Sequence, residues 1–231
     1  MSRHRWFLTK WPITISSIAE KLRENTFQDG KSEGFVLDRI RKEYLEARFI
    51  ERIEYDTIVT DPFGKEFSLK QLNFIQSKFV ISIQQPGLEI IDAPKSVTNL
   101  ITYLSELNNF SLSLDSITVD VLKWTHLLQN ELKTDIEIES VQIGKLVLAK
   151  DILAKVLIKG SGDVRNSCLE MTQNKSFVIE KVQIKLKDSH SSKILLTNTA
   201  VAHINSAQNT EIHIALRDSL AKTKLTNSNL I

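Results

Sequence analysis

Residues 138–143 read Ile-Glu-Ser-Val-Gln-Ile, and residues 179–184 read Ile-Glu-Lys-Val-Gln-Ile, so that five of the six positions agree. Both copies are rich in the β-branched residues that strands favour, at 138, 141 and 143 and at 179, 182 and 184. Each copy also follows a segment whose apolar residues recur at helical spacing. We therefore interpret the pair as a structural repeat, with a strand at each position.

The segments around this repeat have a definite order. Along the chain they are strand 110–117, helix 119–133, strand 136–144, strand 152–160, helix 163–174 and strand 177–187. This βαββαβ order is the ferredoxin-like plan, in which both helices pack on one face of an antiparallel sheet. Further strands are predicted at 194–204 and 211–216, where they would extend the edge of the sheet.

The first half of the chain contains the same kinds of element in a less regular pattern. Helices are predicted at 13–24 and 97–107, from apolar residues that recur every three or four positions. Residues 35–60 have both helical and strand character. The strand is favoured from about Leu45, because a β-branched and aromatic run leads directly into the turn at 61–64.

The predicted fold class is therefore α+β, with antiparallel sheets that carry helices on one face. Two lobes are expected: an N-terminal lobe at 1–108, which can be written as a divergent version of the same plan, and a ferredoxin-like lobe at 109–231. The two repeat copies should present equivalent residues to one helix layer. The residues expected in that core are Trp124, Leu128, Val141, Ile143, Val182 and Ile184.

Composition limits the classes of function. The 231 residues are 42% hydrophobic and 25% charged, which is typical of a globular protein. The net charge of +2 is small for a protein that binds nucleic acid over its whole surface, so any such binding must be local. No apolar run approaches the roughly 18 residues of a membrane helix, and we expect a cytoplasmic protein without membrane association.

Catalytic signatures are absent from the sequence. The single cysteine, Cys168, lies in an apolar helical segment, where a thiol keeps a high pKa. The glycine-rich turn at 160–162 is followed by Asp163, where a phosphate loop has a lysine. We therefore expect no catalytic residue, no cofactor and no metal.

Two histidines are the strongest candidates for a metal pair. His203 and His213 flank a polar segment that resembles a hairpin loop, across which their imidazole rings would oppose each other. A stable transition-metal site needs a third or fourth ligand, and only Glu211 is near in sequence. Two exposed strand histidines are the simpler interpretation.

Basic residues supply the candidate binding surface. Arginines near the N-terminus accompany the aromatic residues Trp6, Phe7 and Trp11, and guanidinium groups beside exposed rings suit phosphates and bases. Neighbouring acidic residues such as Asp38 and Glu46 would neutralise part of this charge. The candidate nucleic-acid-binding residues are Arg3, Arg5, Arg39, Arg41, Arg48 and Arg52, with Lys181, Lys185 and Lys187 as an alternative site.

Two ferredoxin-like lobes with basic sheet surfaces would resemble the architecture of RNA-binding proteins and of CRISPR-associated repeat-processing proteins. The chain lacks an RNP-type aromatic consensus and a glycine-rich loop near the C-terminus. The resemblance implies a non-enzymatic nucleic-acid-binding subunit of a larger assembly, such as one of prokaryotic antiviral defence. The alternative is a protein-interaction scaffold or oligomerisation module, whose free strand edges would pair with a protein partner or a second copy.

Overall fold

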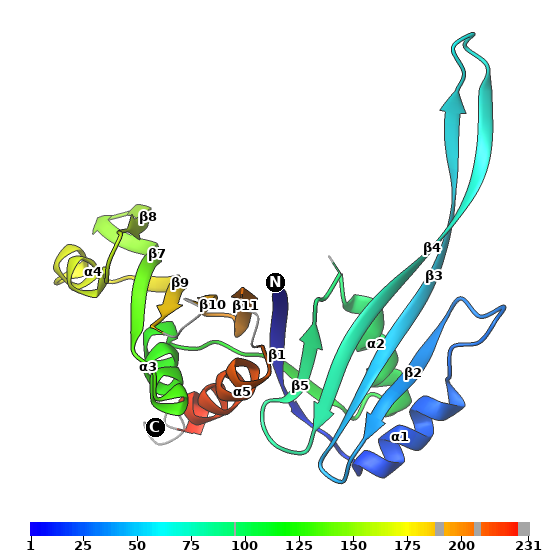
Figure 1. Ribbon diagram of the computed structural model, residues 1–231, viewed down its shortest axis with the longest axis horizontal. Coiled ribbons are helices and arrows are strands. Elements are labelled where there is room, and N and C mark those ends of the chain that lie inside the picture. Colours follow the sequence, from blue (N-terminus) through cyan, green and yellow to red (C-terminus); the bar gives the residue numbers. More distant parts are fainter. Residues whose placement is uncertain (95, 188–191, 206–208, 226–231) are drawn as a thin grey trace. The chain divides into compact units, whose positions relative to one another are not determined.

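The computed structural model describes residues 1–94, 96–187, 192–205 and 209–225 (Figure 1). The chain is α+β, and it divides into two compact units. Unit 1 comprises Met1–Leu8 together with Leu114–Ile231, and unit 2 comprises Thr9–Ser113. Within the described residues, no helix combines the length and the apolar character that crossing a membrane requires.

Unit 2 is a four-stranded antiparallel meander with two helices. Its elements are α1 (Ile15–Glu24), β2 (Glu33–Ile40), β3 (Tyr44–Thr60), β4 (Glu66–Ser82), β5 (Gly87–Ile91) and α2 (Thr98–Leu107). The strands pair in the order β2-β3-β4-β5. The strand interpretation of 45–60 is therefore confirmed, and both predicted helices are present.

The core of unit 2 lies between this sheet and its two helices. Helix α1 begins after Thr14, whose side chain accepts a hydrogen bond from the backbone N–H of Ser17, and it buries a stripe of apolar residues. The ring of Phe35 on β2 lies 5.1 Å from that of Phe49 on β3 and 5.5 Å from that of Tyr103 on α2. Aromatic packing thus joins helix α2 to the sheet.

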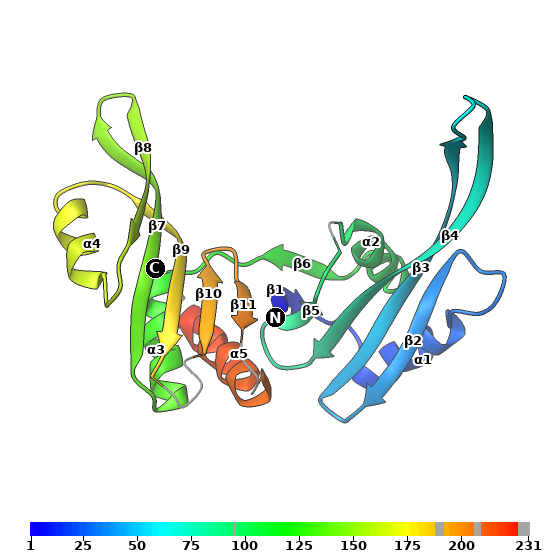
Figure 2. The same cartoon turned by 45° about the horizontal axis from the view of Figure 1, so that its top comes forward.

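Unit 1 contains the remaining elements. They are β1 (Ser2–Lys10), β6 (Ser113–Ser116), α3 (Val121–Leu132), β7 (Ile136–Ala149), β8 (Ile152–Lys159), α4 (Arg165–Thr172), β9 (Val178–Leu186), β10 (Lys193–Thr197), β11 (Val201–Asn205) and α5 (Asn209–Leu225). The strand order is β1-β11-β10-β9-β7-β8, and each of these neighbours pairs antiparallel (Figure 2).

The two copies of the repeat lie side by side in this sheet. Ile138 pairs with Ile184, Val141 with Val182, and Ile143 with Ile179, so β7 and β9 present matching residues to the same face. The predicted core is confirmed: all six expected residues are buried in one cluster, including Trp124 from α3. The repeat is therefore a pair of antiparallel neighbours rather than two separate copies of a motif.

The ferredoxin-like strand order was wrong. That plan needs the first strand of the motif inside the sheet, but β6 pairs with β1, and β9 pairs directly with β7. The physical reason is that β6 has only four residues and none of them is buried. A central strand has neighbours on both edges and buried residues in the core, and β6 provides neither. Unit 2 also departs from the plan, because its strands pair in simple chain order.

The predicted strands after residue 190 were partly wrong. Segment 194–204 is a hairpin of β10 and β11, closed by a turn in which Ala200 has a φ of 53°. Segment 211–216 belongs to helix α5 rather than to a strand. The buried residues of helix α5 have helical spacing: they are Ile212, Ala215, Leu216, Ser219, Leu220 and Thr223.

Helices α3, α4 and α5 cover one face of the unit 1 sheet. Residues of α3 and α4 line one pocket above Ile138 and Val141. The indole N–H of Trp124 on α3 donates to the backbone oxygen of Leu216 on α5, so that helix packs in the same layer. The opposite face of the sheet carries no helix from the described part of unit 1.

Candidate nucleic-acid interface

The helix-free face of unit 1 is defined by the register of its strands. Arg3 on β1 pairs with His203 on β11, His203 pairs with Leu195 on β10, and Leu195 pairs with Gln183 on β9. Paired residues of an antiparallel ladder share a face, and their sequence neighbours point to the other one. The neighbouring row, which contains Ala202 and Val182, is buried under the helices. Arg3 and His203 therefore lie on the open face.

Positive charge gathers on this open face from both ends of the chain. Its cations on β1, β9 and β10 are Arg3, Arg5, Lys181, Lys185 and Lys193. Lys185 and Lys193 are direct cross-strand partners, and two carboxylates lie beside them: Glu137 is the ladder partner of Lys185 on β7, and Glu139 pairs with Lys193. The sequence suggested Arg3 and Arg5 as one site and Lys181 and Lys185 as another, and the fold brings them onto one surface.

Three carboxylates lie along the same region, and each forms an ion pair with a lysine, one of them Lys193 of the open face itself. Glu139 pairs with Lys193 at 2.9 Å. The remaining ion pairs are Glu137 with Lys187 at 3.1 Å and Glu180 with Lys155 at 2.7 Å. Among the described residues, no carboxylate forms an ion pair with Arg5, Lys181 or Lys185. The face therefore keeps an excess of positive charge.

The pKa of His203 reflects both its burial and the positive charge of the face. Burial lowers the pKa of its imidazole, and the charges of Arg3 and Lys181 lower it further. Arg5 has a similar environment: burial lowers its pKa first, and Arg3 adds to the effect. Its guanidinium lies 4.6 Å from the centre of the Phe7 ring. An anion at this position would relieve a repulsion that the folded protein otherwise carries.

The lowered pKa of His203, caused first by burial and then by the charges of Arg3 and Lys181, predicts a measurable acid sensitivity. Because the pKa of folded His203 lies below its ordinary value of 6.5, the unfolded chain binds more protons as the pH falls through that value. The free energy of unfolding should therefore decrease between about pH 7 and pH 5, and His203→Gln should reduce that decrease. Urea unfolding at both pH values measures the difference.

The matched control for this prediction is His126→Gln, because His126 is exposed on α3. That substitution should leave the pH dependence of the parent protein unchanged. Identical pH dependence in His203→Gln and the parent would show that folding does not lower the pKa of His203.

The other candidate arginines belong to unit 2: Arg39 lies on β2, Arg48 and Arg52 lie on β3, and Arg41 lies between the two strands. The three on strands pair with carboxylates. Arg48 donates three hydrogen bonds to Asp38, the shortest of 2.9 Å. Arg52 pairs with Glu54 at 2.6 Å. Arg39 pairs with Glu46 at 3.6 Å, while Arg41 donates to the backbone oxygen of Ile40. The mixed-charge interpretation of this segment fits these contacts.

The N-terminal aromatic residues do not form a stacking surface. Trp6 and Phe7 are buried, and the Trp6 ring meets that of Trp124 edge to face at 5.9 Å in the core. The indole N–H of Trp11 donates to the backbone oxygen of Gly87 within unit 2. The expectation of exposed rings beside the arginines was therefore wrong for Trp6 and Phe7.

The histidine pair does not form across a hairpin. His203 lies on the open face of the sheet, whereas His213 lies on helix α5, on the other side. The ring of His213 packs instead against that of His4, with 4.6 Å between the ring centres. The hypothesis of opposed strand imidazoles fails because residues 209–225 are helical.

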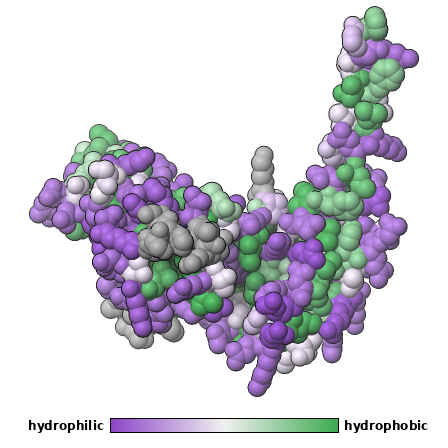
Figure 3. Space-filling view, viewed as in Figure 1, coloured by the Kyte–Doolittle hydropathy of each residue, from purple (hydrophilic) through white to green (hydrophobic). Residues whose placement is uncertain are grey.

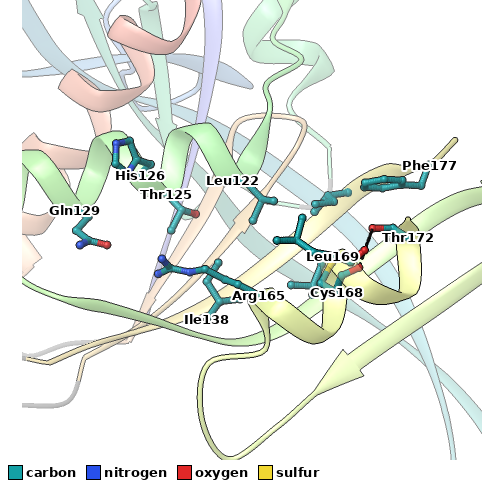
Figure 4. Close-up of a pocket in the computed structure, with 12 residues that line it drawn as sticks. Leu122, Thr125, His126, Gln129, Ile138, Arg165, Cys168, Leu169, Thr172 and Phe177 are labelled. Carbon is teal, nitrogen blue, oxygen red and sulfur yellow. Dashed lines mark hydrogen bonds between the residues drawn. The ribbon is translucent and has the colours of Figure 1, made fainter. Parts of the chain in front are cut away.

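A small pocket between α3 and α4 surrounds Cys168 (Figure 4). Its volume of about 150 Å³ is below the roughly 300 Å³ at which ligand pockets begin, and most of its lining is apolar. Burial raises the pKa of the Cys168 thiol, which makes it a poor nucleophile. The Thr172 hydroxyl donates to the backbone oxygen of Cys168 at 2.7 Å, as an ordinary helical contact.

Sequence reasoning missed a second surface, the hairpin formed by residues 53–74, which we call the arm. Strands β3 and β4 pair along their full length, from Tyr44 with Ser82 to Thr60 with Glu66. Strands β2 and β5 flank only the first part of this ladder, and the arm extends beyond them (Figure 1). Hydrophobic residues are exposed along the arm (Figure 3). Alternating apolar residues at 53–59 indicated the strand, but they did not indicate that its apolar residues would be exposed to solvent.

Comparison with known proteins gives no family to which these surfaces can be assigned. No protein-family model matches the sequence, and a search of curated proteins finds no match. The geometry defines two surfaces: the cationic open face of unit 1 and the apolar arm of unit 2.

Proposed function

We propose that this protein is a non-enzymatic nucleic-acid-binding subunit of a larger assembly, and that it binds through the open face of unit 1. The observation that supports this proposal is the convergence of Arg3, Arg5, Lys181 and Lys185 around His203. Phosphate oxygens are the natural partners of such a cluster, because they neutralise the repulsion between its members.

The dimensions of the face suit a nucleic-acid backbone. Neighbouring strands lie about 4.8 Å apart, so the distance from β1 to β9 across β11 and β10 is roughly 14 Å. One strand of a B-form duplex has about four phosphates along that length of the helix axis. Among the described open-face positions of these strands, the aromatic rings are those of His203 and of Phe7, which is buried beside Arg5, so base stacking contributes little. Binding should therefore depend on phosphates and be nearly independent of sequence.

The test is fluorescence anisotropy with short single-stranded RNA and DNA at several salt concentrations. Lys181→Glu combined with Lys185→Glu should weaken binding at least about tenfold near 100 mM salt. The slope of log affinity against log salt should fall by roughly 0.7 for each single-strand phosphate that the variant no longer binds. The base sequence of the oligonucleotide should have little effect on either quantity.

Arg39→Glu combined with Arg41→Glu is the matched control, because it makes the same charge change on unit 2 and Arg39 is already paired there. It should change the affinity much less. An equal loss in both double variants would place the site elsewhere. No salt-dependent binding by the parent protein near 50 mM salt would contradict the proposal itself.

The assembly part of the proposal depends on the arm rather than on the cationic face. A two-stranded ribbon is at best marginally stable by itself, and its exposed apolar residues favour a protein partner. The arm, rather than the cationic face, favours the alternative function, which is a protein-interaction or oligomerisation module.

A further inference from the structure

One face of the arm carries no charge. Cross-strand partners share a face, so one side of the arm presents Ile53, Tyr55, Thr57 and Val59 from β3 with Phe67, Leu69, Gln71 and Asn73 from β4. All of the large apolar residues among them are exposed, Leu69 by 51%. The same row continues through Glu51, whose carboxylate accepts a hydrogen bond from Asn99 of α2, to Phe49, which is buried in the core of unit 2. The arm is thus a continuation of a core face beyond the part that the helices cover.

The other face of the arm is acidic, while the tip carries one aspartate and one lysine. Residues 53–74 contain four carboxylates, on Glu54, Asp56, Asp61 and Glu66, and two lysines, which gives a net charge of −2. This sign excludes a phosphate backbone as the natural occupant. The outer edges of both strands are also free of strand partners among the described residues, since β2 pairs only as far as Glu51 and β5 only as far as Lys78.

A surface of complementary character lies on unit 1 of the same chain. Strand β8 ends the sheet order, so its outer edge has no strand partner in the described part of the chain. Its exposed apolar residues include Ile152, Leu153 and Leu157, the last exposed by 64%. Residues 145–159 contain four lysines and one aspartate, a net charge of +3. An uncovered hydrophobic edge strand is a template for pairing with another chain.

We infer that the arm of one copy docks on the β8 edge of a second copy, in a head-to-tail contact. The two surfaces match in three respects: both are apolar, both have free strand edges, and their charges are opposite. The inference rests on the assembly part of the proposed function and is independent of nucleic-acid binding. A contact between different surfaces of identical chains propagates, and it ends in a closed ring or an open filament.

The size of the surfaces sets the expected strength. Eight residues of paired strand extend about 27 Å. Such a contact lies near the lower end of specific interfaces, which bury about 1,200 Å² or more. We therefore expect reversible association whose mean mass rises with protein concentration in the micromolar range, with a marked decrease at high salt because the surfaces are oppositely charged.

Two charge-reversal variants test the contact by sedimentation velocity. The arm variant is Glu54→Lys with Glu66→Lys, whose ladder partners Leu72 and Thr60 are uncharged. The edge variant is Lys150→Glu with Lys159→Glu, at two exposed positions. Each variant alone should remain monomeric, because its arm and its edge then carry charge of the same sign. An equimolar mixture should associate again, because every arm then finds an edge of opposite charge. A chain that carries both reversals should also associate.

Glu106→Lys on helix α2 and Ile83→Ser are the controls for charge and for apolar exposure outside the arm, and both should associate as the parent does. Dimers of the parent that the arm variant abolishes and the edge variant leaves intact would overturn the inference in favour of arm-to-arm packing. A parent that stays monomeric at every concentration would overturn self-association altogether. Neither result bears on the Lys181 and Lys185 binding test, so the two proposals fail separately.

Discussion

Trp124→Ala is expected to lower the free energy of unfolding by about 3–5 kcal/mol, the cost of truncating a large buried aromatic residue. The Trp124 side chain is 0% exposed. Its indole N–H donates to the backbone oxygen of Leu216 at 3.2 Å and to the hydroxyl of Ser219 at 3.0 Å. The substitution leaves a cavity against Trp6 and removes the hydrogen bonds that hold α3 to α5. Urea unfolding followed by circular dichroism measures the change.

Trp124→Phe separates packing from hydrogen bonding. It keeps most of the apolar packing and removes the indole donor, but the Ser219 hydroxyl still donates to the Leu216 oxygen at 3.0 Å. A decrease of about 0.5–1.5 kcal/mol in the free energy of unfolding is therefore expected. His126→Ala, at an exposed position of the same helix, should change stability by no more than about 0.5 kcal/mol. A decrease below about 1 kcal/mol for Trp124→Ala would mean that α3 does not turn this face to the core.

Local pattern was sufficient to predict the elements around the repeat. The β-branched residues of the repeat indicated β7 and β9, and helical spacing indicated α3 with the residues that it buries. The strand interpretation of 45–60 was also correct, because β-branched residues and a turn at 61–64 favour that conformation independently of distant contacts. These features depend on residues close together in sequence.

Strand order depends on distant pairing, and the sequence pattern did not contain it. The βαββαβ succession is compatible with more than one sheet, and the choice was made by the shortness of β6 and by the direct pairing of β7 with β9. Helix α5 was missed for a related reason. Ile212, Ile214 and Leu216 alternate like a strand, and the helical spacing becomes clear only when Leu220 and Thr223 are included.

For the candidate site too, local features could be predicted from the sequence and distant strand pairing could not. Charge counting found the basic residues, but no local signal indicates that β1 joins β11 and so brings Arg3 beside His203. The acidic neighbours of Arg39 and Arg48 were visible in the sequence, and they form the ion pairs that this proximity suggests. The arm was predicted as strands. Its exposure followed only from where β2 and β5 end.

Phe35→Ala should destabilise unit 2 by about 3–5 kcal/mol, because Phe35 joins both layers of that unit. Its ring is fully buried and packs against those of Phe49, Phe79 and Tyr103, with centres 5.1–6.0 Å apart. Alanine would remove all three ring pairs at once and weaken the packing of α2 on the sheet, where the pair of Phe49 with Tyr103 remains. Hydrogen exchange by mass spectrometry measures the effect for each segment, and protection in β2, β3 and β4 should decrease together.

Phe63→Ala is the matched control, since Phe63 lies at the tip of the arm with 96% of its surface exposed. The same substitution there should alter stability by no more than about 0.5 kcal/mol. Protection in β7 and β9 should be retained in Phe35→Ala, because those strands draw their core from unit 1. An equal decrease of protection in β7 and β9 would show that the two compact units unfold as one cooperative structure, and an unchanged unit 2 would show that Phe35 does not hold its layers together.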